Sequence, residues 1–414
     1  MKKLFPELEP WQKDFTLLVC CGLVNGLGSS LFFLALPYYV YEITGQAYAA
    51  GAAFFVLTLP RVLFGSLGGV FADRSSRKRL IIVTNLASAI AFLPLLFVHS
   101  ADSIWLIYIV VFLGYALGQF TAPAESAILP QLVGREKLVW ANGILAISGS
   151  IVSLAGPVIG GFLLGIAGFS AVVLLNVISF LLAALLIAFM KPIPSTNVKN
   201  VNRTLWSQIV APWYEWLDGL RYVQKDYNVK LIFILSGIIM IADGIYNSLW
   251  VVWVKNDLET TSFQFGLLGS VLGLGILLGG FVYVRLGNKL NTHIIWVSSL
   301  LTGILLIATY TFPILWLVIA FTTMRGVLAV GFYTGASTLL QQRAPDNYVG
   351  RILGSFSAFK AIMLLVGSTL AITVSDVVPV VIILNAAGLL WIVASLTVIA
   401  LYRKRKAHDR KRLF

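Results

Sequence analysis

A few charged and amide side chains lie inside long apolar stretches of the chain, where they could bind a ligand or carry a proton. These residues are Asn25, Arg61, Asp243, Arg325 and Lys360. A charge at the centre of a membrane costs about 3 kcal/mol on insertion scales, so each is expected to face a partner or a water-filled cavity. We expect Asp243 to pair with Arg325. Arg61 and Lys360 would then repel each other unless an anionic or polar part of a ligand lies between them; the alternatives are a deprotonated Lys360, or bases that extend to a membrane surface.

Aromatic and polar residues accompany the acid at helical spacing. Asp243, Tyr246, Asn247 and Trp250 fall on one helical face, because they stand at positions i, i+3, i+4 and i+7. Such a face suits an amphiphilic ligand. Weaker polar faces carry Asn25 in one apolar stretch and Gln119 in another.

Two carboxyl groups are candidates for carrying a proton. Asp243 is the first candidate, because it lies in the middle of an apolar stretch, and Glu125 is the second. A structural ion pair between Asp243 and Arg325 is the competing interpretation. The sequence has no nucleotide-binding loop, metal-ligand cluster or nucleophile constellation. We therefore expect neither an enzyme nor a cofactor or metal.

The composition is that of a polytopic helical membrane protein. Of the 414 residues, 59% are apolar and only 11% are charged. Apolar runs of about 20 residues recur, as an ~30 Å hydrocarbon core requires. We predict an all-α fold with twelve spans at 15–41, 47–72, 79–98, 104–126, 140–165, 169–190, 229–254, 263–285, 293–312, 314–341, 350–374 and 378–402.

The basic residues predict the orientation of these spans. The formal net charge is +13, and all but four of the 30 Lys and Arg residues fall on one side of the predicted spans or at its edge. The exceptions are Lys255 on the other side and Arg61, Arg325 and Lys360 inside spans. Basic segments stay cytoplasmic, so we expect both termini and the turn around Asp73 on that side. The basic excess therefore indicates membrane topology and lipid contact, and no nucleic-acid partner.

A polar segment divides the chain into two halves. The predicted order is a cytoplasmic N-terminus (1–14), a six-helix bundle (15–190), a linker with an interfacial helix (191–228), a second bundle (229–402) and a basic tail (403–414). The halves are weakly similar in sequence, as in transporters that bind substrate near the midplane between two repeats.

Two glycine-containing motifs carry a family resemblance. The first is Gly69-x-x-x-Asp73-Arg74-x-x-Arg77-Lys78, with Ser76 where a glycine is usual and Val284 in place of the acid in the second half. The second comprises Gly143, Gly156, Pro157, Gly160 and Gly161, with Val152 at one glycine position. Together they resemble the major facilitator superfamily and its antiporter pattern.

Further stretches resemble one branch of that family, the macrolide-efflux and enterobactin exporters. They include Ala122-Pro-Ala-Glu-Ser-Ala-Ile-Leu-Pro130, Leu138-Val-Trp-Ala-Asn142 and Pro345-Asp-x-x-x-Gly350-Arg351. Gly114 stands where we align the family's fourth-helix arginine.

The resemblance implies a proton-coupled exporter (an antiporter) of small amphiphilic compounds such as drugs or siderophore-like molecules. It would act as a monomer in a bacterial cytoplasmic membrane. It also implies a cytoplasmic gate of Gly69, Asp73, Arg74, Arg77, Lys78 and Glu125. Asp73 would cap the helix that begins near Gly350, and Arg77 would pair with Glu125; alternatively, the bases of this turn only enforce topology. The alternatives for function are an organic-anion importer or proton symporter, and a non-transporting scaffold or sensor.

Overall fold

The chain is helical throughout its regular elements, as the sequence predicts. The computed structural model describes residues 10–191, 221, 223–224, 226–286, 292–343 and 348–412. Within these ranges, eleven helices are long and apolar enough to cross a membrane. The predicted interfacial helix in 191–228 falls largely outside the described residues.

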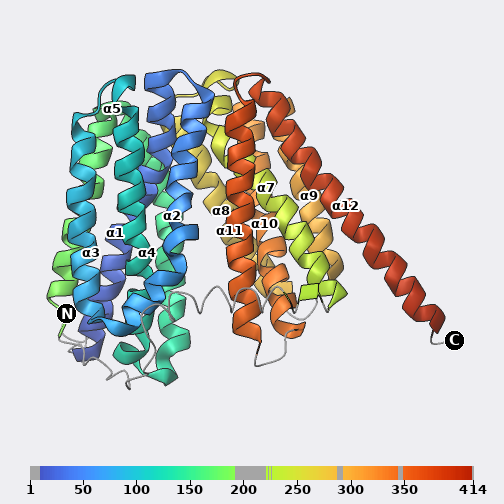
Figure 1. The fold of residues 1–414 in the computed structure, drawn as a ribbon, viewed down its shortest axis with the longest axis horizontal. Coiled ribbons are helices and arrows are strands. Elements are labelled where there is room, and N and C mark those ends of the chain that lie inside the picture. Colours follow the sequence, from blue (N-terminus) through green and yellow to red (C-terminus); the bar gives the residue numbers. More distant parts are fainter. Residues whose placement is uncertain are drawn as a thin grey trace, which may run out of the picture. The chain divides into compact units, whose positions relative to one another are not determined.

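The helices follow the predicted spans closely (Figure 1). Their bounds are α1 Pro10–Thr44, α2 Ala47–Arg74, α3 Arg77–Phe92, α4 Ile104–Val133, α5 Leu138–Ala188, α7 Tyr227–Asn256, α8 Ser262–Leu286, α9 Thr292–Thr311, α10 Leu315–Arg343, α11 Val349–Val374 and α12 Val380–Arg412. Short 3-10 turns at Leu93–Phe97, Ala101–Ser103 and Arg135–Lys137 join the helices on either side of α4.

One helix contains two of the twelve predicted spans. The 51-residue α5 is interrupted at Gly168, whose φ is +74° and ψ is −179°. A residue with a side chain rarely adopts this positive φ, so glycine allows the chain to turn here without a loop. The spans predicted at 140–165 and 169–190 are thus the two arms of α5, which reconciles eleven helices with twelve spans.

The chain forms two compact units, each defined by the contacts among its own helices. Unit 1 comprises Met1–Thr44, Val56–Val210 and Ser262–Ser270; unit 2 comprises Gly45–Phe55, Ala211–Thr261 and Val271–Phe414. Relative to the predicted halves, the start of α2 packs with unit 2 and the start of α8 packs with unit 1.

Each unit has its own helix packing. In unit 1, α1 packs along α5, and α3 packs on both α4 and α5. In unit 2, α7 lies between α11 and α12, and α9 contacts α10 and α12. These pairings bring residues from distant parts of the sequence onto shared interior faces, which is what the candidate sites require.

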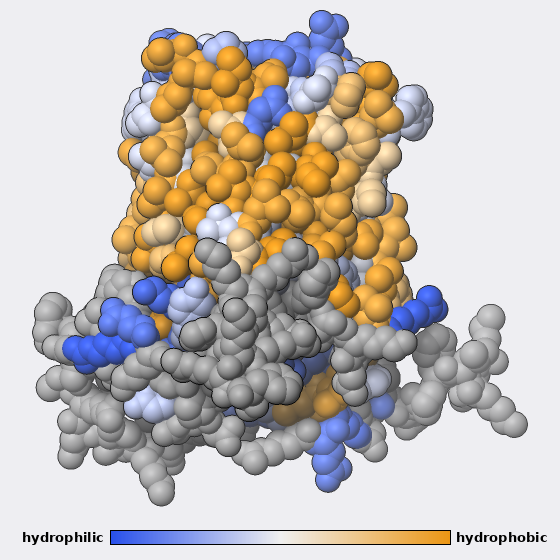
Figure 2. Space-filling view, turned by 90° about the vertical axis from the view of Figure 1, so that its right-hand side faces the viewer, coloured by the Kyte–Doolittle hydropathy of each residue, from blue (hydrophilic) through white to orange (hydrophobic). Residues whose placement is uncertain are grey.

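The outer surfaces of the helices are apolar. Phe281 and Val284 on α8, Trp316 on α10 and Val393 on α12 are all exposed. Figure 2 shows one face on which apolar side chains fill the middle and hydrophilic ones gather toward its ends. This distribution fits a surface surrounded by hydrocarbon, and the chain is a multi-pass membrane protein.

Candidate functional site

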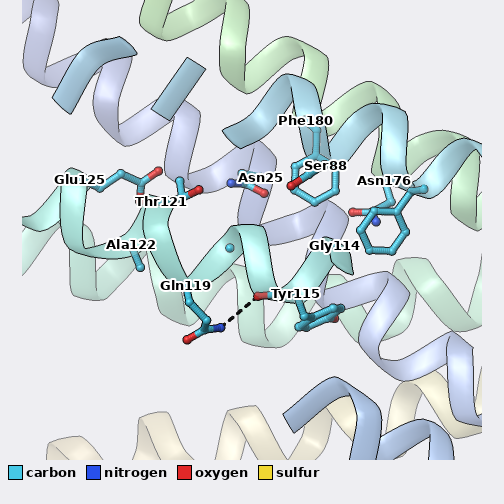
Figure 3. Close-up of a pocket in the computed structure, with 12 residues that line it drawn as sticks. Asn25, Ser88, Gly114, Tyr115, Gln119, Thr121, Ala122, Glu125, Asn176 and Phe180 are labelled. Carbon is cyan, nitrogen blue, oxygen red and sulfur yellow. Dashed lines mark hydrogen bonds between the residues drawn. The ribbon is translucent and has the colours of Figure 1, made fainter. Parts of the chain in front are cut away.

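Unit 1 contains a cavity of about 190 Å³, which we call the Glu125 cavity. One face of α4 forms most of its wall, and α1, α3 and α5 complete it (Figure 3). Its lining residues are Asn25, Ser88, Phe92, Gly114, Tyr115, Gly118, Gln119, Thr121, Ala122, Glu125, Asn176 and Phe180. Three residues singled out from the sequence, Asn25, Gln119 and Glu125, are therefore brought together here.

Glu125 stands on α4 between two prolines inside the helix, Pro123 and Pro130. The thiol of Cys21, which is fully buried on α1, donates to Glu125 Oε1 over an S···O distance of 3.9 Å. A thiol is a weak donor. The expected partner Arg77 instead donates to the Ala127 carbonyl oxygen at 2.9 Å, and no basic side chain is among the described contacts of Glu125. Glu125 is thus half-buried, and its described contacts compensate little of the carboxylate charge.

Amide and hydroxyl groups join the helices beside Glu125. Asn25 donates from its amide nitrogen to Asn85 Oδ1 at 3.2 Å, and Asn85 donates to the Ile81 carbonyl oxygen at 2.8 Å. Thr84 and Thr121 share a hydrogen bond of 2.8 Å between α3 and α4. These bonds fix the faces of α1, α3 and α4 that line the cavity, because each joins side chains from different helices or anchors one to its own helix.

Two polar atoms in the cavity wall have no hydrogen-bond partner: Asn176 Oδ1 and the Tyr115 hydroxyl. Asn176 is 1% exposed. In Figure 3, Asn176 and Glu125 lie at opposite sides of the lining group, and Asn25 lies between them. Buried polar groups are nearly always paired, so two unpaired atoms in one cavity indicate space for a ligand or ordered water.

A close approach of α2 to α4 supports the same wall. Pro123 lacks the amide hydrogen that would bond the Gln119 carbonyl oxygen, and this oxygen faces Gly68 on α2. A β-carbon at Gly68 would overlap that oxygen, so only glycine fits. By contrast, a β-carbon on Gly69 would meet nothing within 4 Å. Gly68, and not Gly69, makes the close contact.

The turn between α2 and α3 carries the expected gate residues. Lys78 donates to the carbonyl oxygen of Ala188 at 2.8 Å and also to that of Met190, at the C-terminal end of α5. A cation at a helix C-terminus is favourable. The side chains of Asp73 and Arg74 lie outside the described residues, so the expected capping by Asp73 remains a prediction.

The glycines of the antiporter-like pattern differ in their contacts. A β-carbon on Gly160 would lie 2.8 Å from the Leu31 carbonyl oxygen on α1, and one on Gly161 would lie 2.8 Å from the Gly266 Cα at the start of α8. Gly156 packs equally closely on Ser30, and the Pro157 carbonyl oxygen faces Gly266. A β-carbon on Gly143 would meet nothing within 4 Å. Four of the five residues thus pack α5 tightly.

Unit 2 contains a second polar group, which we call the Asp243 cluster and define as Asp243, Tyr246, Arg325 and Tyr333. The Tyr333 hydroxyl donates to Asp243 Oδ2, and Arg325 donates to the Tyr246 hydroxyl at 2.6 Å. The guanidinium also lies 4.1 Å from the Tyr246 ring centre. Arg325 is 8% exposed and interacts electrostatically with Asp243. The described hydrogen bonds of the acid and the base therefore go to tyrosines.

The remaining residues expected in a cavity have separate environments. Trp250 lies beside Tyr246 with ring centres 5.3 Å apart, whereas Asn247 donates to the Asp243 carbonyl oxygen of its own helix at 2.7 Å. Lys360 is half-buried, with its ammonium 4.6 Å from the Phe356 ring centre. Arg61 is exposed on α2.

The sequence interpretation missed several participants. It does not single out Cys21, Asn85 or Asn176. Tyr333 follows Arg325 by eight residues, close to two helical turns, so helical spacing could have placed both on one face of α10. No comparable local signal pairs Cys21 with Glu125, because they lie 104 residues apart.

The profile of the Major Facilitator Superfamily matches residues 18–225 and 232–413. The chain belongs to this family, as the motifs around Asp73 and Gly156 indicated, and the family consists of transporters, not enzymes.

Curated relatives include drug-efflux proteins. The chain is 22% identical over 373 residues to macrolide efflux protein A of Streptococcus pyogenes, covering 88% of this chain and 90% of the relative. It is 24% identical over 379 residues to multidrug resistance protein MdtG of Citrobacter koseri, covering 88% and 89%.

Solved structures of transporters share the fold. A POT family transporter in complex with 5-aminolevulinic acid has a TM-score of 0.76 at 14% identity, covering 94% of this chain and 96% of that one. The nucleoside transporter NupG has a TM-score of 0.73 at 14% identity, covering 94% and 99%. At this identity the likeness concerns the fold alone.

Proposed function

We propose that this chain is a proton-coupled exporter, an antiporter that moves small amphiphilic compounds such as drugs or siderophore-like molecules. It would act in a bacterial cytoplasmic membrane as a monomer with both termini in the cytoplasm. The bacterial efflux relatives support the direction of transport, and the distribution of basic residues supports the orientation.

The observation that carries this proposal is the Glu125 cavity. It combines one half-buried carboxyl group with aromatic side chains and polar atoms that have no protein partner. A carboxyl group in an apolar setting can bind and release a proton as its surroundings change. The aromatic side chains offer apolar contact to the rest of a substrate.

Coupling follows from competition at Glu125. When the cavity is open to the cytoplasm, the ionised carboxylate would hold the substrate. When the cavity is open to the outside, a proton would bind the carboxyl group and the substrate would leave. The proton would then be released to the cytoplasm as the next substrate binds, which exchanges one for the other across the membrane.

Asp243 is the alternative proton carrier, and its contacts support a structural role instead. Its carboxylate accepts a hydrogen bond from Tyr333 and has Arg325 nearby, so its charge is compensated. Protonating it would weaken both interactions. Glu125 has no comparable compensation among its described contacts, which makes it our preferred carrier.

Uptake of an organic anion is the second candidate function. Arg61, Arg325 and Lys360 supply cationic groups in the spans, and an anion could bind them. The engagement of Arg325 with Tyr246 favours export over this candidate, because that guanidinium already has a partner. A scaffold without transport activity predicts no substrate-driven proton movement at all.

Transport in inverted membrane vesicles tests the proposal. Vesicles with and without the protein are given dye, macrolide and siderophore panels, and accumulation is followed before and after a protonophore collapses the gradient. Export predicts accumulation of some panel members that stops with the protonophore. Accumulation unaffected by the protonophore would contradict proton coupling, and accumulation only in right-side-out vesicles would favour uptake.

A further inference from the structure

We propose that the Glu125 cavity is a binding subsite for a protonated amine attached to a ring-sized apolar group. The inference rests on the proposed function and adds the chemical class of the substrate's head group. The ammonium would pair with the Glu125 carboxylate, and the ring would lie against the aromatic wall of Phe92 and Phe180.

The groups left without a strong partner in the cavity are two acceptors, the Glu125 carboxylate and Asn176 Oδ1, and one hydroxyl, that of Tyr115. The amide nitrogen of Asn25 is engaged with Asn85, and the amide nitrogen of Gln119 donates to the Tyr115 carbonyl oxygen at 3.2 Å (Figure 3). Asn176 Oδ1 and Glu125 can only accept, and Asn176 Oδ1 has no partner. A ligand ammonium can donate to the Glu125 carboxylate, whereas this carboxylate would repel an anion.

The aromatic side of the cavity suits the rest of such a ligand. The rings of Phe92 and Phe180 stack with centres 5.6 Å apart, and the edge of Phe32 meets Phe92 at 4.9 Å. A rigid wall of this kind gives an apolar ring a flat surface, and aromatic faces also attract cations.

The volume of the Glu125 cavity limits the size of the group that can bind there. An apolar cavity of about 150 Å³ holds a benzene molecule. The 190 Å³ found here therefore admits one aromatic or alicyclic ring with a short amine-bearing chain. A larger amphiphile would place only its amine-bearing end in this subsite.

The subsite also explains how a proton could displace its ligand. Both the ammonium and the proton need the same carboxylate, so protonating Glu125 removes the charge that holds the amine. Amine affinity should then fall as pH falls, although the amine itself stays protonated throughout.

Equilibrium dialysis of the purified full-length protein in nanodiscs tests this inference. The probes are phenethylamine and phenethyl alcohol, which differ in the ammonium group but have nearly the same size. We expect the amine to bind roughly tenfold or more tightly than the alcohol, since hydrogen bonds to charged groups are the stronger ones. Only the binding affinity of the amine should fall toward mildly acidic pH. Equal affinities for both probes, or a pH-independent preference, would overturn the inference without any variant.

Two variants locate the site. Glu125→Gln should abolish the preference for the amine, whereas Glu136→Gln, which removes a carboxylate from an exposed position of the same unit, should keep it. Retention of the full preference by Glu125→Gln, or its loss in Glu136→Gln, would overturn the assignment.

The outcomes separate this inference from the proposed function. Proton-driven efflux of panel compounds combined with equal binding of amine and alcohol leaves the function standing and overturns the subsite. Selective amine binding without proton-driven efflux keeps the subsite and overturns export.

Discussion

Each of the two units contains a half-buried carboxyl group on a membrane-spanning helix, and the two groups have different hydrogen-bond partners. In unit 2, Asp243 accepts a hydrogen bond from Tyr333, and the nearby Arg325 donates to Tyr246. In unit 1, the described hydrogen bond of Glu125 comes from the thiol of Cys21. Two further polar atoms of its cavity have no partner.

This difference separates a structural network from an exchange site. A polar network whose charged members have hydrogen-bond partners holds its helices in one arrangement, here α7 and α10. A buried group with weak partners costs folding energy, and such groups concentrate where a ligand will pair with them. We therefore assign helix positioning to the Asp243 cluster and exchange of substrate and proton to the Glu125 cavity.

The largest effect is expected from Glu125→Gln. The variant keeps the shape of the side chain but can neither ionise nor release a proton. Proton-driven transport in vesicles should fall to background, while the amount of folded protein, measured by size-exclusion chromatography, stays the same.

Glu136→Gln is the matched control and should transport normally. If Glu125→Gln retained proton-driven transport and Asp243→Asn lost it at equal expression, the roles that we assign to the two units would be reversed.

The second prediction concerns Arg325→Ala. Breaking a buried charged pair by removing one partner costs about 3–5 kcal/mol, so the variant should unfold at a clearly lower temperature than the wild type. Thermal unfolding in detergent, followed by tryptophan fluorescence, measures the shift. The paired variant Arg325→Ala with Asp243→Asn should recover part of the loss, because no uncompensated charge remains. If Arg325→Ala unfolded at the same temperature as the wild type, the Asp243 cluster would not have the structural role that we assign to it.

The fold was predictable from the sequence, and the pairing of the side chains was only partly so. Apolar runs and basic turns fix the number and order of spans, because a hydrocarbon core of fixed thickness leaves few alternatives. Helical spacing correctly placed Asp243 and Tyr246 on one face. It could not show that tyrosines accept or donate the hydrogen bonds of Asp243 and Arg325, since these contacts depend on how α7 and α10 pack.

The Glu125 cavity was harder to predict for the same reason. Asn25, Gln119 and Glu125 come from two helices and were noted separately, whereas Asn176 comes from the second arm of α5. Only the packing of α1, α3, α4 and α5 against one another brings these residues to a common space. The role of Cys21 has no local signal in the sequence, because its partner Glu125 lies 104 residues away.

The third prediction tests whether close packing of α1 on α5 maintains the cavity. Gly160 faces the backbone of Leu31, so Gly160→Ala should force the helices apart and cost about 1–3 kcal/mol. Because α1 carries Cys21 and Asn25, amine binding should weaken in parallel. Gly143→Ala introduces the same methyl group into open space and should change stability by less than about 0.5 kcal/mol. Equal unfolding temperatures for the two variants would show that this contact does not support the site.

The smallest effect is expected at the turn between α2 and α3, where the two halves of the sequence also differ. Asp73 has no acidic counterpart in the second half, since Val284 occupies the equivalent position and is 81% exposed. We propose that Asp73 caps a helix N-terminus when the cytoplasmic gate closes, an interaction worth about 0.3–1 kcal/mol. Asp73→Asn should therefore slow transport severalfold without changing expression.

A double-mutant cycle of Asp73→Ala and Arg77→Ala, read as transport at constant expression, measures whether the two residues act together. Arg77 also holds the Ala127 carbonyl oxygen two residues beyond Glu125, so its loss alone should disturb the end of α4 near the cavity. Coupling between the two variants would link the gate to the Glu125 cavity in the same unit. Full activity of Asp73→Ala would reduce this turn to a marker of topology, and the functional difference between the units would then rest on Glu125 alone.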